Sequence, residues 1–144
     1  NMTDVIASLG LIQFERYPEM LVKRKEMIEK MDTAFADINV AVLNHYGKNH
    51  ASSGHLYIVR LLGKTREQTN EVIEKMAERG IATNVHYKPL PMMTAYKKIG
   101  FDIKDFPNAY HMFENEITLP LNTKMTMEDV DYVIENFVDI VKSF

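Results

Sequence analysis

The sequence predicts an α+β fold in which helices pack on a small mixed sheet, preceded by a helical arm. Three observations lead to this prediction: apolar residues recur at helical spacing in several segments, two helix starts carry a capping box, and short segments between them have the composition or alternation of strands. With 144 residues, a single domain buries about two-thirds of its unfolded surface. We therefore expect one core that needs neither a metal nor a disulfide.

The first part of the chain, residues 1–37, is predicted to be the helical arm. Thr3 can cap a helix whose apolar positions then recur at helical spacing. Pro18 disfavours helical geometry at the residue before it, so we expect this helix to stop there and a second one to begin. The second helix has an apolar stripe of Leu21, Ile28, Met31, Phe35 and Ile38.

The remaining residues, 38–144, are predicted to form the small α+β domain. Residues 44–54 carry turn formers and no periodicity, which indicates a surface loop. Residues 56–62 have the composition of a strand covered on both faces. A helix begins after Thr65, which forms a capping box with Gln68, and ends at Gly80.

Alternation predicts a further strand over residues 81–87, with a right-handed crossover if it lies parallel to the strand at 56–62. Short helices are expected near 94–99 and 107–115. An edge strand follows over 116–121, where Pro120 is tolerated. The last helix begins after Thr126, which forms a second capping box with Asp129.

Composition excludes several classes of function. The 17 basic residues are outnumbered by 20 acidic ones, which argues against a nucleic-acid partner. The absence of cysteine excludes disulfides, thiol catalysis and thiolate metal sites, and it suits a reducing compartment, so we expect a cytoplasmic protein. The apolar runs are too short to span a membrane, and we expect no signal peptide.

A search for catalytic and metal-binding patterns gives few candidates. His45, His50 and His55 are five residues apart, a spacing that puts neighbours on different faces, so no metal site is predicted. The acidic residues, Glu116 among them, are expected to be solvated. Every lysine is expected on a solvated helix, loop or turn, and none is nominated for catalysis.

His86 and Tyr87 are the best functional candidates that the residues alone supply. They follow a predicted strand and precede a proline-stiffened loop, a position from which polar aromatic side chains can face a ligand. In the structural alternative, Asn84 and His86 hydrogen-bond neighbouring loops. Arg60, alone in an apolar strand, needs an anionic or carbonyl partner, and an internal carboxylate and a substrate are the two alternatives.

Four segments, in order, resemble conserved stretches of one enzyme family. They are the helix start Asn1-Met2-Thr3-Asp4, the strand His55 to Arg60, the run Gly80 to Leu90 with Tyr96 after it, and Leu119-Pro120-Leu121 before the Thr126 helix. Together they are similar to the carboxyl-terminal part of the sugar-nucleotide aminotransferases of the DegT/StrS group, which depend on pyridoxal phosphate. The resemblance covers nearly the whole chain.

The resemblance implies the small C-terminal domain of an aspartate-aminotransferase-like enzyme of fold type I. It implies a parent homodimer that moves an amino group from an amino acid such as glutamate to a keto-sugar nucleotide, for amino sugars of lipopolysaccharide or another cell-surface polysaccharide. The lysine that holds the cofactor lies in the N-terminal domain of such enzymes and is not in this sequence. We therefore expect a piece of a longer protein, which alone binds no cofactor and is inactive.

The resemblance also assigns residues. Asn1 matches a position near the cofactor phosphate of the partner subunit, and His86 and Tyr87 match the segment that approaches the phosphates or hydroxyls of the sugar nucleotide. The chain departs from the family pattern at Pro91, where a histidine is common, and at Met93-Thr94, in place of Gln-Pro, so the sugar remains open. Two alternatives also remain open: a dehydratase of the same family, and a free-standing α+β module for ligand binding or dimerisation.

Overall fold

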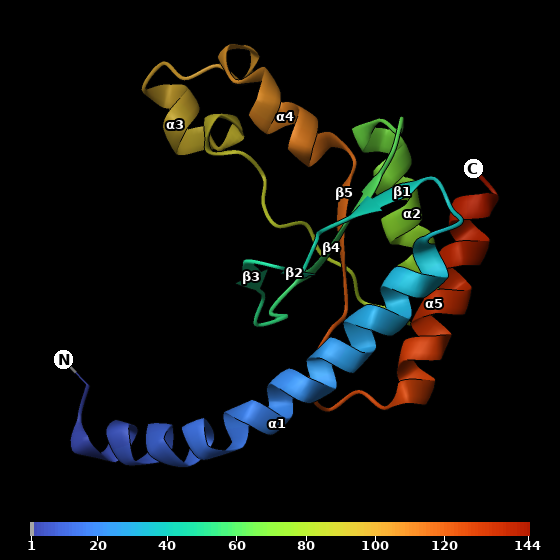
Figure 1. The fold of residues 1–144 in the computed structure, drawn as a ribbon. Coiled ribbons are helices and arrows are strands. Elements are labelled where there is room, and N and C mark those ends of the chain that lie inside the picture. Colours follow the sequence, from blue (N-terminus) through green and yellow to red (C-terminus); the bar gives the residue numbers. More distant parts are fainter. Residues whose placement is uncertain (1) are drawn as a thin grey trace.

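The computed structural model describes residues 2–144 and shows a long helix that runs into a body of helices and a small sheet (Figure 1). The α+β class is confirmed. The larger elements are α1 (Asp4–Phe35), β1 (Val40–Val42), β4 (Tyr57–Leu61), α2 (Arg66–Glu78), β5 (Glu116–Leu119) and α5 (Met127–Lys142). The smaller ones are β2 (Tyr46–Gly47), β3 (His50–Ala51), η1 (Leu90–Met92), α3 (Thr94–Lys98), η2 (Ile103–Asp105) and α4 (Pro107–Glu114).

The main sheet has three strands in the order β1-β4-β5, and both pairings are antiparallel. Tyr57 lies opposite Leu119, and Val42 lies opposite Val59. The sheet is therefore antiparallel throughout, whereas a mixed sheet was predicted. Residues 81–87 do not add a parallel strand to β4; they reach β5 through a single antiparallel bridge between Asn84 and Thr118.

Helix α1 is continuous from Asp4 to Phe35, so the predicted break at Pro18 is wrong. Proline already has a helical φ angle; it removes one hydrogen bond, to the carbonyl of Phe14, and its ring crowds that carbonyl, but the helix continues through it. Phe14 is exposed, which leaves that carbonyl to water. The second half of α1 is held in the core by Met27, Ile28, Met31 and Phe35.

Both predicted capping boxes are present. Thr65 accepts from the N–H of Gln68 while the Gln68 side chain accepts from the N–H of Thr65, and Thr126 and Asp129 repeat this arrangement at α5. Gly80 follows α2 with a φ of 75°, a conformation that glycine adopts without strain. The starts of the two helices that flank the sheet are thus fixed by local sequence.

The core lies where α1, α2 and α5 meet the sheet. Phe35 packs against Phe137 with ring centroids 5.0 Å apart. Tyr57 is fully buried, and its hydroxyl donates to Oδ1 of Asp32 over 2.7 Å. The ring of His45 stacks on Tyr57 with an interplanar angle of 6°. The segment 44–54, predicted as a loop, contains this buried histidine and the two-stranded hairpin of β2 and β3.

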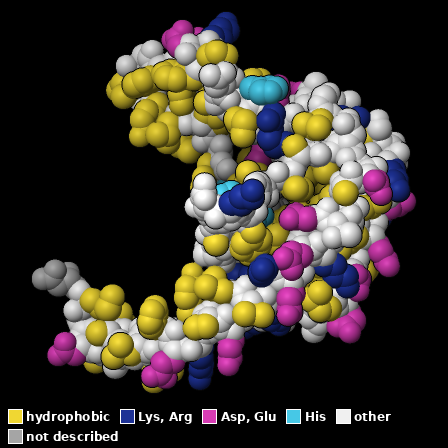
Figure 2. All heavy atoms as spheres, in the orientation of Figure 1, with side chains coloured by type: hydrophobic (Ala, Val, Ile, Leu, Met, Phe, Trp, Pro, Cys, Tyr) yellow, Lys and Arg dark blue, Asp and Glu magenta, His cyan; other side chains and the backbone are white. Residues whose placement is uncertain are grey.

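Residues 90–114 form a separate lobe, called here the η1–α4 lobe, which contains the two short helices predicted near 94–99 and 107–115. Figure 2 shows hydrophobic side chains gathered on this lobe and along the N-terminal half of α1, called here the free half because the residues of α1 that are buried in the core all lie in its second half. None of the helices in the described part of the chain is long and apolar enough to cross a membrane.

Candidate functional site

His86 lines a pocket of about 300 Å³ between the segment 82–86, the C-terminal end of β5 and the residues just before β4. Both polar and apolar residues line the pocket, a combination typical of small-molecule sites. Its lining residues are His55, Leu56, Ala82, Thr83, Asn84, His86, Thr118, Leu119, Pro120 and Leu121.

The position of His86 is set by two residues of β5. The main-chain N–H of His86 donates to Oε2 of Glu116 over 3.0 Å, and its ring Nδ1 lies 2.9 Å from Oγ1 of Thr118. The Thr118 hydroxyl donates to Oε1 of Glu116 over 2.6 Å. Glu116 is only 4% exposed, so the expectation that it is solvated is wrong. The segment 82–86 lies along the outer edge of β5, where the N–H of His86 and the hydroxyl of Thr118 both donate to this carboxylate.

The hydrogen bonds of Asn84 and His86 explain why this segment pairs with β5 at a single residue and is not a strand. Its main chain exchanges both hydrogen bonds with Thr118, over 3.1 and 2.8 Å, but its side chain also accepts from the N–H of Val85. The next N–H, that of His86, is taken by Glu116. The next rung of a ladder would pair the main chains of His86 and Glu116, but the Glu116 side chain takes the donor of that rung. Asn84 and His86 thus do hydrogen-bond within the chain, but to strand β5 and not, as the structural alternative expected, to neighbouring loops.

Tyr87 is 72% exposed and stands edge-on to the His86 ring, with centroids 4.6 Å apart. It is not among the residues that line the pocket, and its side chain has no hydrogen-bond partner among the described residues. The role of His86 and Tyr87 in binding a substrate stays a prediction. Asn1, the predicted cofactor residue, lies outside the described residues.

Arg60 finds its partner within the chain. Its Nε donates to Oδ1 of Asn115 over 3.0 Å, and its Nη2 donates to the main-chain oxygen of His111 over 3.1 Å. The same Nη2 lies 3.2 Å from Nε2 of His111, whose Nδ1 lies 2.8 Å from Oε1 of Glu114. These partners are an amide oxygen, a main-chain oxygen and an imidazole, and not the internal carboxylate that was considered beside a substrate; they join α4 to β4.

A second arginine, Arg66, was not singled out from the sequence. Its Nη1 donates to the main-chain oxygens of Phe113 and Glu116 over 3.0 and 3.2 Å. Burial lowers the pKa of Arg66, and the nearby charge of Glu116 opposes this shift. A charged residue at the start of a helix is ordinarily solvated, so the sequence offered no signal for this contact.

A second pocket, of about 320 Å³, adjoins the first and shares His55 and Leu56 with it. His45 lines it from the other side and is 4% exposed. Burial lowers the pKa of His45, and the charge of Asp32 opposes this shift. Within residues 2–144 no group of histidine, aspartate and glutamate is arranged to hold a metal ion.

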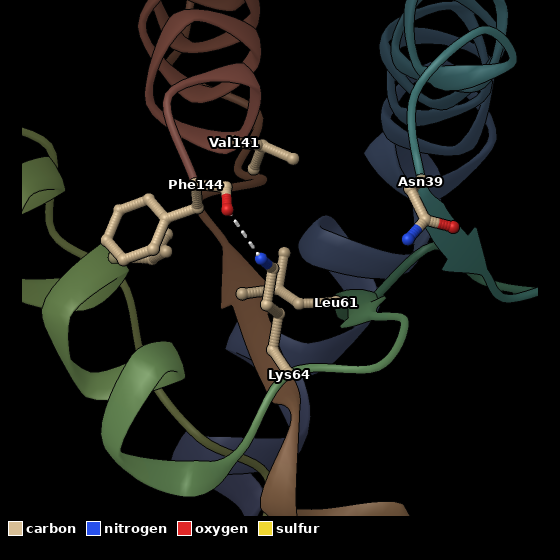
Figure 3. A pocket seen from close by; sticks show the side chains of 6 residues that line it. Asn39, Leu61, Lys64, Val141 and Phe144 are labelled. Carbon is tan, nitrogen blue, oxygen red and sulfur yellow. Dashed lines mark hydrogen bonds between the residues drawn. The ribbon is translucent and has the colours of Figure 1, made fainter.

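A third pocket, of about 170 Å³, lies beyond the C-terminal end of β4, at the opposite end of that strand from His86 (Figure 3). Lys64 lines it, and its ammonium donates to the main-chain oxygen of Phe144 over 2.9 Å. No lysine is among the residues that line the His86 pocket. The described residues that line the His86 pocket therefore include no amine to which an aldehyde cofactor could attach covalently.

Comparison with known proteins places this geometry in a family. The model of the DegT/DnrJ/EryC1/StrS aminotransferase family matches residues 1–138. The spore coat polysaccharide biosynthesis protein SpsC of Bacillus subtilis is 34% identical over 99% of this chain and 37% of its own length. A UDP-4-amino-4,6-dideoxy-N-acetyl-beta-L-altrosamine transaminase of Campylobacter jejuni is 29% identical over 99% of this chain and 38% of its own length.

Solved structures agree with the fold. A putative sugar aminotransferase from Streptococcus pneumoniae, solved in apo, PMP and PLP forms, superposes with a TM-score of 0.96 at 50% identity, over 99% of this chain and 36% of its own. PseC of Helicobacter pylori, an aminotransferase involved in the biosynthesis of pseudoaminic acid, superposes with a TM-score of 0.86 at 27% identity, over 100% of this chain and 38% of its own. The chain thus spans somewhat more than a third of these relatives. With the family model matched along nearly its whole length, the chain belongs to the DegT/DnrJ/EryC1/StrS aminotransferase family.

Proposed function

We propose that this chain is the C-terminal portion of an aminotransferase that depends on pyridoxal phosphate and transfers an amino group from an amino acid, glutamate in the first instance, to a keto-sugar nucleotide. The match of the family model to residues 1–138 carries this proposal. Two further observations support it: relatives of the same coverage are named as transaminases of nucleotide sugars, and a relative was solved in PLP and PMP forms.

In this proposal the described residues bind and orient the sugar nucleotide. The His86 pocket offers a half-buried imidazole, main-chain edges and apolar walls, and Tyr87 stands exposed beside it. Pyridoxal phosphate supplies the electron sink for amino transfer, and its lysine belongs to the part of the enzyme outside this chain. The chain by itself is then inactive and binds no cofactor.

The proposed partner of this chain within the enzyme is the cofactor domain, with residues 1–37 as the linking arm and 38–144 as the small domain. The free half of α1 supports a covering partner, because its apolar side chains are exposed along its length (Figure 2). These residues are Val5, Ile6, Leu9, Leu11, Ile12, Phe14 and Tyr17, and Met2, which precedes the helix, is exposed as well. We include in the proposal a homodimer, a cytoplasmic location and a role in amino-sugar synthesis for a cell-surface polysaccharide such as lipopolysaccharide.

The substitution His86→Ala in the aminotransferase that contains this chain tests the proposal. Loss of one ligand hydrogen bond lowers kcat/KM for the sugar nucleotide about tenfold. The half-reaction with glutamate changes less, because glutamate does not require this side chain. His50→Ala is the matched control, since His50 is exposed and lines none of the three pockets described above.

Three results would count against the proposal. One is an equal loss of activity in the His50 variant. Another is a loss of folded protein that accounts for the whole effect of His86→Ala. The third is a wild-type enzyme that converts keto-sugar nucleotides to products without nitrogen, which would favour the dehydratase.

A further inference from the structure

The hydrogen bonds that join Glu116, Thr118 and His86 run in one direction. An ionised carboxylate only accepts hydrogen bonds, and a hydroxyl has one hydrogen to donate. At 2.6 Å from Oε1 of Glu116, the Thr118 hydroxyl spends that hydrogen on the carboxylate. Its oxygen can then only accept from the His86 ring, 2.9 Å away. The ring proton of neutral His86 is therefore on Nδ1.

The other carboxylate oxygen strengthens this arrangement. Oε2 of Glu116 accepts the main-chain N–H of His86, so both oxygens of one side chain hold the same residue, one directly and one through Thr118. Glu116 is 4% exposed and Thr118 is 5% exposed, which keeps water from competing for these bonds. Glu116 and Thr118 therefore fix both the tautomer and the position of the His86 ring.

The free edge of the ring follows from this. With the proton on Nδ1, Nε2 of neutral His86 carries a lone pair and no hydrogen. Nε2 has no hydrogen-bond partner within residues 2–144, and His86 lines the pocket. A ligand group that pairs with this atom must bring its own hydrogen. A hydroxyl can do so, whereas the oxygens of an ionised diphosphate can only accept.

We infer that Glu116 and Thr118 are positioning residues that hold His86 as a hydrogen-bond acceptor, so that the pocket recognises a hydroxyl of the sugar and not the phosphates of the nucleotide. The choice of a sugar nucleotide as ligand rests on the proposed function. The tautomer itself rests only on the hydrogen bonds described here.

His111 provides an internal reference with the same tautomer and separate partners. The guanidinium of Arg60 always donates, and it lies 3.2 Å from Nε2 of His111, so that nitrogen accepts. The Nδ1–H of His111 then donates to Glu114. Neither bond involves Thr118 or Glu116.

The first test is nitrogen-15 NMR of the chain, at a pH where imidazole is neutral, with long-range proton correlations that identify the protonated ring nitrogen. We expect the proton on Nδ1 in both His86 and His111. In Thr118→Val, which keeps the shape and removes the acceptor, His86 shifts toward the Nε2–H form, whereas Thr118→Ser retains Nδ1–H. His111 stays unchanged in both variants.

A proton on Nε2 of His86 in the wild-type chain overturns the inference, and this result needs no variant to fold. An unchanged His86 tautomer in a folded Thr118→Val chain also overturns it, since Thr118 would then not select the tautomer.

The second test uses the aminotransferase that contains this chain and compares ligands. Thr118→Val raises KM for the keto-sugar nucleotide about tenfold, with a smaller change in kcat, and Thr118→Ser restores it. The inhibition constants of uridine diphosphate and thymidine diphosphate, which lack the sugar, stay unchanged. Equal weakening of these diphosphates shows that His86 meets a phosphate, and it overturns the inference. A wild-type enzyme without transaminase activity refutes the proposed function instead, and the NMR result stands apart from it.

Discussion

The buried hydrogen bond between Tyr57 and Asp32 joins the central strand to α1, and Tyr57→Phe removes only its hydroxyl. Tyr57 is 0% exposed, and its hydroxyl lies 2.7 Å from Oδ1 of Asp32. Burial, followed by this hydrogen bond, holds the pKa of Tyr57 far above its ordinary value, so the phenol remains the donor. Phenylalanine keeps the ring that packs against Phe35 and stacks with His45. The substitution therefore isolates one hydrogen bond to a charged group.

The expected cost follows from the nature of the two partners. A hydrogen bond to a charged group contributes about 1.5–3 kcal/mol net. Asp32 is half-buried, so water can reach the oxygen that loses its donor, and the lower part of this range, about 1.5–2 kcal/mol, is expected. At a slope of about 2 kcal/mol per molar urea, the unfolding midpoint falls by about 1 M.

Urea unfolding of the chain, followed by circular dichroism, measures this change. Tyr132→Phe is the matched control: its hydroxyl donates to the main-chain oxygen of Arg79, but the side chain is 51% exposed, so a change below about 0.5 kcal/mol is expected. Asp32→Ala, which removes the acceptor, completes a double-mutant cycle with Tyr57→Phe. A change of less than about 0.5 kcal/mol in Tyr57→Phe, or a coupling energy near zero, would refute the reasoning.

Two further predictions concern stability. Burial lowers the pKa of His45 in the folded chain below its ordinary value of 6.5, so the unfolded chain binds the proton first and the free energy of unfolding falls as the pH drops below 6.5. His45→Phe should flatten this fall in urea unfolding at several pH values; a slope that is unchanged contradicts the prediction. Thr126→Ala removes the oxygen that caps α5 and should cost about 1 kcal/mol, whereas Thr126→Ser should cost less, both by urea unfolding. Equal stability of the alanine variant and the wild type would show that this cap contributes nothing.

The parts of the fold that depend on nearby residues could be predicted from the sequence. The capping boxes at Thr65 and Thr126 join residues three positions apart, and both are present. The strand predicted at 56–62 is β4. The strand predicted at 116–121 is β5, which begins at Glu116 as predicted and lies at the edge of the sheet. In each case composition and alternation within a few residues sufficed.

The errors at residues 81–87 and at Glu116 share a physical cause, which is competition from groups far apart in the sequence. Residues 81–87 alternate as a strand does, but Glu116, thirty positions away from His86, takes one of the N–H groups that a ladder would use. The same contact buries Glu116, which no local pattern indicates. The one signal in its neighbourhood is that Glu116 and Thr118 share a strand face. The sequence could thus single out His86, but not the two residues that orient it.

The bridge between Asn84 and Thr118 also has a consequence for self-association. The unpaired edge of a sheet is a template on which another chain can add a strand. On the outward side of β5, the N–H and C=O of Thr118 are both bonded to Asn84. The main-chain oxygen of Glu116 accepts a hydrogen bond from Arg66, and Pro120 has no N–H to offer. This border of the sheet therefore presents few free groups to a second molecule, and the sheet ends there without a full fourth strand.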